Sequence, residues 1–190
     1  MSHDHFHVHG PHDHEMEHAA HSGDPLAGRI AMMTAIFATI GALYGYMAGA
    51  TQNEALLFKN EAAIKTLEAS DQWNFYQAKS SKQNLAELGA TLTTGEPQAK
   101  YLQEVERYKK EKDEIKTQAE KLETAGKEAE RKSEESMHVH HRWAQSMTLI
   151  QIAIALAAIT ILTRNKGLMY AAYGAAAVAI TLGVLAGMHI

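Results

Sequence analysis

Three stretches of about twenty residues contain no Asp, Glu, Lys or Arg, and this segregation of charge constrains the fold more than any other feature. They cover residues 30–50, 144–163 and 168–188. A helix needs about 20 apolar residues to cross roughly 30 Å of hydrocarbon. A buried helix of a soluble protein is the alternative, but it seldom requires so long an uncharged run. We therefore expect transmembrane helices over residues 25–50, 143–163 and 167–189.

The chain begins with a histidine-rich tail, residues 1–24, that shows no apolar periodicity and is therefore expected to be disordered. It lacks the basic start of a signal peptide, so the first span is expected to be an uncleaved anchor. The sequence requires no cofactor, but imidazoles could hold Zn, Ni, Co or Cu. The candidate ligands are His3, His5, His7, His9, His12, His14, His18 and His21.

Residues 51–142 are rich in Glu and Lys and form a polar insert between the first and second spans. Two stretches with heptad spacing flank a Gly-, Thr- and Pro-containing segment at about residues 89–97, which predicts a turn. The predicted fold is an all-α membrane protein with three transmembrane helices. A long extramembrane antiparallel coiled-coil hairpin joins the first span to the second.

Each arm of this hairpin has an apolar seam in the sequence. The first is predicted at Leu57, Ile64, Leu67, Ala78, Leu85 and Leu88, with Asn60, Asp71, Asn74 and Ser81 at its polar positions. The second is predicted at Tyr101, Val105, Tyr108, Ile115, Ala119, Leu122 and Ala129, interrupted by Lys112 and Gly126. Nothing breaks either helix at the membrane border, so each arm could continue into its span.

Two further groups of residues predict packing. Trp73, Phe75 and Tyr76 form an aromatic cluster in the first arm, which must pack beside the seam or against another subunit. Small residues at four-residue spacing allow the backbones of membrane helices to approach closely. The candidates for such contacts are Gly41, Gly45, Gly49, Gly183 and Gly187.

The end of the second arm, residues 136–143, carries His138, His140, His141, Arg142 and Trp143. Such a polar and aromatic segment is typical of a bilayer interface. His138 and His141 share one helical face and form a second, weaker metal candidate. After the second span, residues 163–167 predict a tight cationic turn in which Gly167 is the C′ residue.

Positive charge beside the spans predicts the orientation. Arg29, Arg164 and Lys166 favour a cytoplasmic tail and a cytoplasmic second turn, with the hairpin and the C-terminus periplasmic. Arg131, Lys132 and Arg142 lie on the opposite side and weaken this bias. The expected location is a bacterial inner membrane, with multiple spans.

The segment 53–84 resembles an uncharacterised bacterial membrane-protein family, domain of unknown function 4337. The resemblance rests on Glu68, Ala69, Ser70, Asp71, Trp73, Phe75, Tyr76, Gln77, Ala78 and Lys79, which match the core EAS(D)xWxFYQAK. It extends in layout to most of the chain, and it implies a membrane protein but no activity.

The net charge of −4 gives no electrostatic reason to expect a nucleic-acid partner. No nucleophile and base pair or phosphate loop is visible, so we expect no catalytic activity. The chain is expected to be a membrane-anchored structural or interaction protein that forms a homo-oligomeric scaffold. An unknown protein partner is a further option. One alternative is metal handling or metal sensing by the tail. Another is an oligomeric channel or transporter component, lined by Gln145, Ser146, Thr148 and Gln151.

Overall fold

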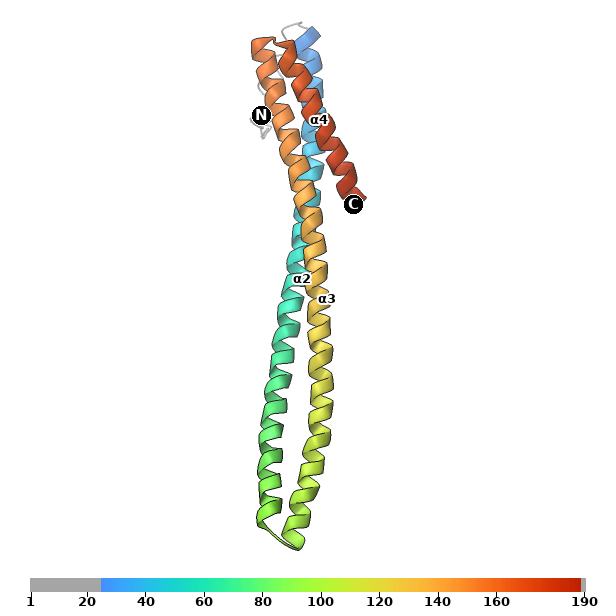
Figure 1. The fold of residues 1–190 in the computed structure, drawn as a ribbon. Helices are drawn as coiled ribbons and strands as arrows, with labels where there is room; N and C mark the ends of the chain where they lie inside the picture. Colours follow the sequence, from blue (N-terminus) through green and yellow to red (C-terminus); the bar gives the residue numbers. More distant parts are fainter. Residues whose placement is uncertain (1–24, 189–190) are drawn as a thin grey trace, which may run out of the picture. The chain divides into compact units, whose positions relative to one another are not determined.

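The computed structural model describes residues 25–188, and these residues are helical apart from two short connections and Met188. The helices are α2 (Pro25–Leu92), α3 (Glu96–Thr163) and α4 (Lys166–Gly187) (Figure 1). The described chain contains no strand, so the prediction of an all-helical protein is confirmed there. The expected tail at residues 1–24 lies outside the described residues.

The chain divides into two compact units, each built from antiparallel segments. Unit 1 comprises Met1–Thr51 and His138–Ile190, and unit 2 comprises Gln52–Met137. Both α2 and α3 are unbroken helices of 68 residues, each contributing one segment to each unit. The expected continuity of each arm with its apolar segment is therefore correct.

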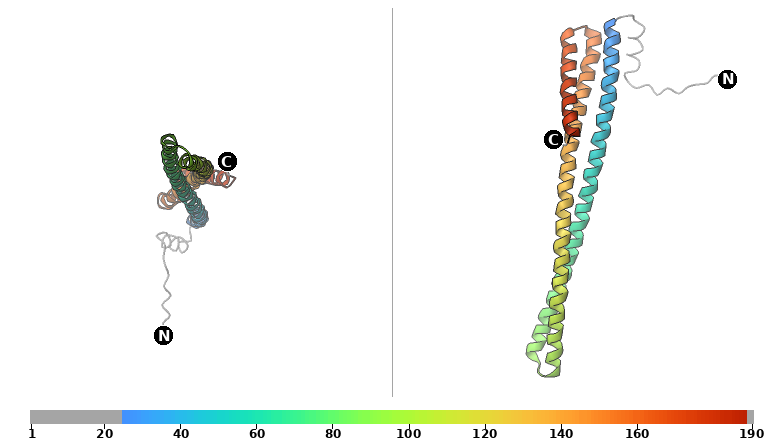
Figure 2. Two further views of the ribbon diagram at one scale, coloured as in Figure 1. Left: turned by 90° about the horizontal axis from the view of Figure 1, so that it is seen from below. Right: turned by 90° about the vertical axis from the view of Figure 1, so that its right-hand side faces the viewer.

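Unit 1 packs three helices around small side chains. Figures 1 and 2 show α4 beside the unit 1 segments of α2 and α3. The face that α4 buries is a stripe of small residues, Ala172, Ala176, Ala179, Gly183 and Ala186. The core opposite it includes Phe37 and Tyr44 from α2, and Trp143 and Ile150 from α3. Small residues on one helix thus accommodate large ones on its neighbours, which allows the helices to pack closely.

Unit 2 is held together by a seam with heptad spacing, but the α2 side of this seam is not the predicted one. Its buried residues include Ala55, Ala62 and Ala69, seven residues apart, followed by Ala86 and Ala90. The predicted leucines point elsewhere: Leu57, Leu67 and Leu85 are 70%, 67% and 68% exposed. The prediction for this arm was therefore wrong in register.

The physical reason is the fit between the two helices. The α3 side of the seam is close to the predicted one, with buried Val105, Ala119 and Ala129. It also carries larger half-buried residues such as Tyr108 and Ile115. A helix that presents such side chains packs more densely against alanines than against leucines. The alanine face of α2 therefore faces α3, and the leucine face is left outward.

The two connections are short. Residues 93–95 join α2 to α3, where Gly95 has φ +72°, a left-handed conformation that glycine adopts without steric cost. Arg164 takes the left-handed position after α3, with φ 53°, and Asn165 caps α4 by accepting a hydrogen bond from the Gly167 backbone N–H. The prediction of Gly167 as the C′ residue was wrong, because Gly167 already lies inside α4.

Candidate functional site

The middle of unit 2 contains a polar-aromatic cluster that joins α2 to α3. Its members are Trp73, Tyr76, Lys79 and Gln83 on α2, and Tyr108, Glu111, Lys112 and Glu123 on α3. All four α2 members lie in the segment 53–84, which carries the family resemblance, and three of them (Trp73, Tyr76 and Lys79) are among its matching residues. That segment is therefore a helix-pairing element within the chain.

Trp73 lies at the edge of the seam with both its polar atom and its ring engaged. Its Nε1–H donates to Glu123 Oε1 at 2.7 Å, and its ring meets Tyr76 edge-on, with centroids 5.6 Å apart. Tyr76 lies seven residues after Ala69, so it continues the alanine seam with a larger side chain. The edge-to-face contact orients the Trp73 ring within α2. The charge-assisted hydrogen bond to Glu123 favours one relative position of α2 and α3.

Lys112 interrupts the predicted apolar seam of α3, and the structure gives this interruption a partner. Its Nζ lies 4.9 Å from the Tyr76 ring centroid and donates to Gln83 Oε1 at 3.1 Å. A cation over a ring face and a hydrogen bond compensate in part for removing the ammonium from water. Lys112 therefore takes part in the packing of the two helices at this level of the seam and does not interrupt it.

Lys79 and Glu111 form an ion pair across the helices, next to Lys112. The Lys79 ammonium donates to Glu111, and together with the neighbouring positive charges this holds the carboxyl pKa below its usual value, although partial desolvation opposes the shift. The Lys79 Nζ also lies 5.6 Å from the Tyr108 ring centroid. The lowered pKa of Glu111 is thus explained chiefly by its ion pair with Lys79 of the other helix.

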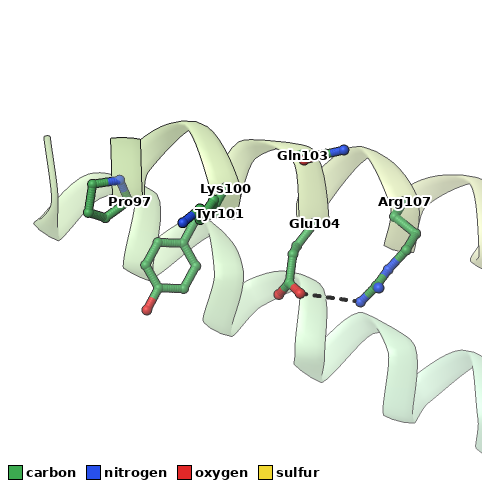
Figure 3. Close-up of a pocket in the computed structure, with 6 residues that line it drawn as sticks. All are labelled: Pro97, Lys100, Tyr101, Gln103, Glu104 and Arg107. Atoms are coloured by element: carbon green, nitrogen blue, oxygen red, sulfur yellow. Dashed lines mark hydrogen bonds and ion pairs between the residues drawn. The ribbon is translucent and has the colours of Figure 1, made fainter. Parts of the chain in front are cut away.

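Surface clefts in unit 2 lie along the helix faces, and two of them are the larger ones among those described. One, of about 1180 Å³, runs beside Trp73, with Ala62, Leu67, Gly126 and Glu130 among its lining residues. The other, of about 710 Å³, is lined by residues of α3 (Figure 3): Pro97, Lys100, Tyr101, Gln103, Glu104 and Arg107. In that cleft Glu104 pairs with Arg107 along the same helix.

The predicted aromatic cluster is divided by the structure. Trp73 and Tyr76 contact α3 residues, whereas Phe75 is 59% exposed on α2. The sequence prediction did not identify the α3 partners Glu111, Lys112 and Glu123. The register of the α3 seam could have identified these partners. Lys112 was already placed on the seam, and Glu111 and Glu123 are each adjacent in sequence to a seam residue.

The five glycines predicted for packing lie in unit 1 and differ in their surroundings. A Cβ added at Gly41 would lie 2.9 Å from Ile150, at Gly45 3.3 Å from Met147, and at Gly183 2.4 Å from the Tyr44 ring. At Gly187 it would make ordinary contact with Trp143, and at Gly49 it would meet nothing within 4 Å. Gly41, Gly45 and Gly183 are thus close-contact positions within one chain.

Among the histidines at residues 138–141 of α3, the rings of His140 and His141 lie 5.5 Å apart between centroids. His138 and His141 are exposed, whereas His140 Nδ1 lies 2.8 Å from the carbonyl oxygen of Ala48. In the described part of the chain there is no group of three or more side chains arranged to hold a metal ion. The eight tail histidines lie outside the described residues.

The polar residues considered for a channel lining face different ways. Ser146 is buried and donates to the Arg142 carbonyl oxygen, while Gln145, Thr148 and Gln151 are exposed. Trp143, expected at the interface, is buried against Tyr44 with ring centroids 5.3 Å apart. Trp143 and Ser146 therefore belong to the core of unit 1.

Comparison with protein families gives a match over most of the chain. The sequence model of the family described as Domain of unknown function (DUF4337) matches residues 26–189, nearly the whole chain. The resemblance noted in the sequence is thereby confirmed. Neither a curated protein nor a solved structure shows a significant match.

Proposed function

The chain belongs to the DUF4337 family, and we propose that it is a multi-pass membrane scaffold of the bacterial inner membrane. Three spans would anchor an extramembrane helical hairpin, unit 2, that serves structural association rather than catalysis. The family description names no activity, so the proposal rests on the residues of this chain.

One observation carries the membrane assignment: unit 1 exposes large apolar residues on all three of its helices. Its three helices contain windows long and apolar enough to cross a membrane, with mean hydropathies of 1.7, 2.0 and 1.8. Large apolar side chains are exposed on each of them, for example Ile36 and Leu43 on α2, Leu162 on α3, and Val184 on α4. An aqueous protein would not leave so much apolar surface bare, whereas lipid solvates it.

The charged side chains of unit 2 support an aqueous setting for it. Its exposed faces carry ion pairs along and between helices, such as Arg131 with Glu128 and Glu135, and Lys59 with Glu130. The pKa of Glu128 is lowered chiefly because the Arg131 guanidinium donates to it. Charges at such density are solvated in water and costly in hydrocarbon.

The polar contacts of unit 2 support a structural role, because their charged groups are paired with other residues of the chain. In the cluster around Trp73, the charged groups pair across the two helices, and in the cleft of Figure 3 the pairing runs along α3. Paired groups of this kind fix helix geometry and register.

The experiment uses the absence of cysteine from the chain. Single substitutions Thr117→Cys in unit 2 and Lys166→Cys in the second connection would be labelled with a membrane-impermeant maleimide in intact spheroplasts. We expect label at Thr117→Cys before lysis and at Lys166→Cys only after it. The reverse pattern would overturn the orientation, and release of the protein by alkaline carbonate would overturn the membrane assignment.

A second candidate, metal handling, is favoured by the density of tail histidines alone. Imidazole nitrogens are common ligands of Zn²⁺, Ni²⁺, Co²⁺ and Cu²⁺. Deleting residues 1–22 should then change the tolerance of the cell to one of these metals. The matched control replaces His138 and His141 with Gln, and equal phenotypes in deleted and intact strains would reject this role.

A further inference from the structure

The leucine face that α2 turns away from α3 is an unpartnered stripe with heptad spacing. We call it the outer stripe, and its apolar members are Leu57, Ile64, Leu67, Ala78, Leu85, Leu88 and Leu92. All seven are exposed, and they recur at the three-, four- and seven-residue steps of a coiled-coil seam. Helix α2 therefore carries two seams, one covered by α3 and one bare.

The remaining surface of unit 2 does not match the outer stripe. Within residues 52–137, all of which the structure describes, the exposed large hydrophobic residues of α3 are Tyr101 and Leu102 near its start. The rest of the exposed α3 surface is dense in Glu and Lys, for example Glu106 with Lys109 and Lys116 with Glu120. Covering the stripe with that surface would desolvate charges without apolar gain.

We propose that the outer stripe binds the outer stripe of a second copy of this chain, parallel and in register. Within this unit the surface chemically matched to the stripe is the stripe itself, which is the condition for a twofold symmetric interface. The parallel direction rests on the proposed function, because spans in one bilayer hold the same residues of two copies at the same depth.

The residues that flank the stripe suit a parallel pair. With Leu57 as the first core position, heptad geometry brings Glu61 of one copy near Leu56 of the other, and Glu68 near Ala63. Lys82 comes near Gln77 in the same way, so no flanking pair brings like charges together. Phe75, the exposed aromatic, lies on the same flank as Lys82 and comes near Ser70.

The polar centre of the stripe sets both the strength and the register. Asp71 and Asn74 occupy core positions and would each face their own equivalent in the other copy. A buried Asn layer specifies register in coiled coils at a cost in stability, and facing carboxylates repel. The association of two outer stripes is therefore weak in dilute solution and depends on the high local concentration in the bilayer. Asp71→Asn should strengthen this association.

The test is disulfide cross-linking of the full chain in native membranes, with Ser81→Cys on the stripe and Thr117→Cys on the exposed face of α3. Ser81 lies at a core position of the stripe and would face its equivalent, within the short Cβ separation that a disulfide requires. We expect a cross-linked dimer of the Ser81→Cys chain, and little from Thr117→Cys. Equal cross-linking, no cross-linking, or linkage of Ser81→Cys to another protein would overturn the proposal.

A second substitution in the Ser81→Cys chain provides the matched comparison. Leu88 on the stripe and Leu102 on α3 are both 54% exposed. Leu88→Glu should lower the cross-linked fraction about tenfold, because it buries an unpaired carboxylate in the interface, while Leu102→Glu should leave it unchanged. Equal effects of the two substitutions would overturn the proposal.

Carbonate extraction of the same membranes tests the membrane assignment separately. A protein that stays in the membrane but forms no cross-linked dimer therefore contradicts the pairing of the stripes alone.

Discussion

Trp73 of α2 donates its indole N–H to Glu123 of α3 at 2.7 Å, which ties the most distinctive sequence segment of the chain to the opposite helix. The donor lies at the edge of a seam whose α2 side is mostly alanine, and its ring also contacts Tyr76. Alanine seams permit sliding because each layer resembles the next. A directional hydrogen bond at one layer therefore helps to select a single register.

Removing this hydrogen bond should weaken unit 2 measurably. Glu123→Ala should lower the free energy of unfolding by about 1 kcal/mol, the usual net contribution of a partly exposed side-chain hydrogen bond. Glu120→Ala, at an exposed site on the same helix, is the control and should change it by less than about 0.5 kcal/mol. The measurement is denaturant unfolding in nanodiscs followed by tryptophan fluorescence, and indistinguishable variants would show that the bond contributes nothing.

The Lys79–Glu111 pair predicts a dependence of stability on pH. The folded pKa of Glu111 lies below its ordinary value of 4.5, so its contribution is present above that value and is lost as the pH falls through the lowered one. Glu111→Gln should therefore have a lower melting temperature than the parent chain at pH 7. The difference should shrink as the pH falls below the ordinary value, because the ion pair is lost when the Glu111 carboxyl is protonated.

Circular dichroism melts at pH 7, 5 and 3 would follow this difference. Lys79→Met is the second arm of the experiment, because it removes the partner and should abolish most of the effect of Glu111→Gln. A melting difference that persists unchanged at pH 3 would contradict the assigned cause.

Much of the architecture was predictable from the sequence because charge and apolarity are segregated along it. The helices, their continuity and most of the α3 seam follow from residue spacing, since Tyr108, Ile115 and Leu122 can satisfy only one face. The α2 register was not predictable from α2 alone. It carries a leucine stripe and an alanine stripe with the same period, and the partner helix decides between them.

The contacts of the polar-aromatic cluster required the structure for a similar reason. A lysine on an apolar seam signals an interruption, and only the position of Tyr76 and Gln83 shows what Lys112 contacts. Likewise, glycines in an apolar helix look equivalent in sequence. Their different surroundings at Gly183 and Gly174 depend on which face of α4 meets α2.

Those two glycines give a prediction for the packing of unit 1. A Cβ at Gly183 would lie 2.4 Å from Tyr44, while one at Gly174 would meet nothing within 4 Å. Gly183→Ala should destabilise the chain by about 1–3 kcal/mol through overpacking. Gly174→Ala should be neutral or slightly stabilising, because alanine favours helix. Thermal unfolding in one detergent compares them, and equal melting temperatures would mean that Tyr44 moves aside freely.

The connection between α3 and α4 predicts a capping effect. Asn165 Oδ1 accepts a hydrogen bond from the Gly167 N–H at 2.8 Å, which satisfies one of the free donors at the start of α4. Asn165→Ala should cost about 1 kcal/mol, and Asn165→Asp should retain most of the stability because a carboxylate also caps. Hydrogen exchange of the first amides of α4 measures the effect locally. Faster exchange in Asn165→Ala but not in Asn165→Asp is expected, and unchanged exchange in both would show that the helix start is held by packing instead.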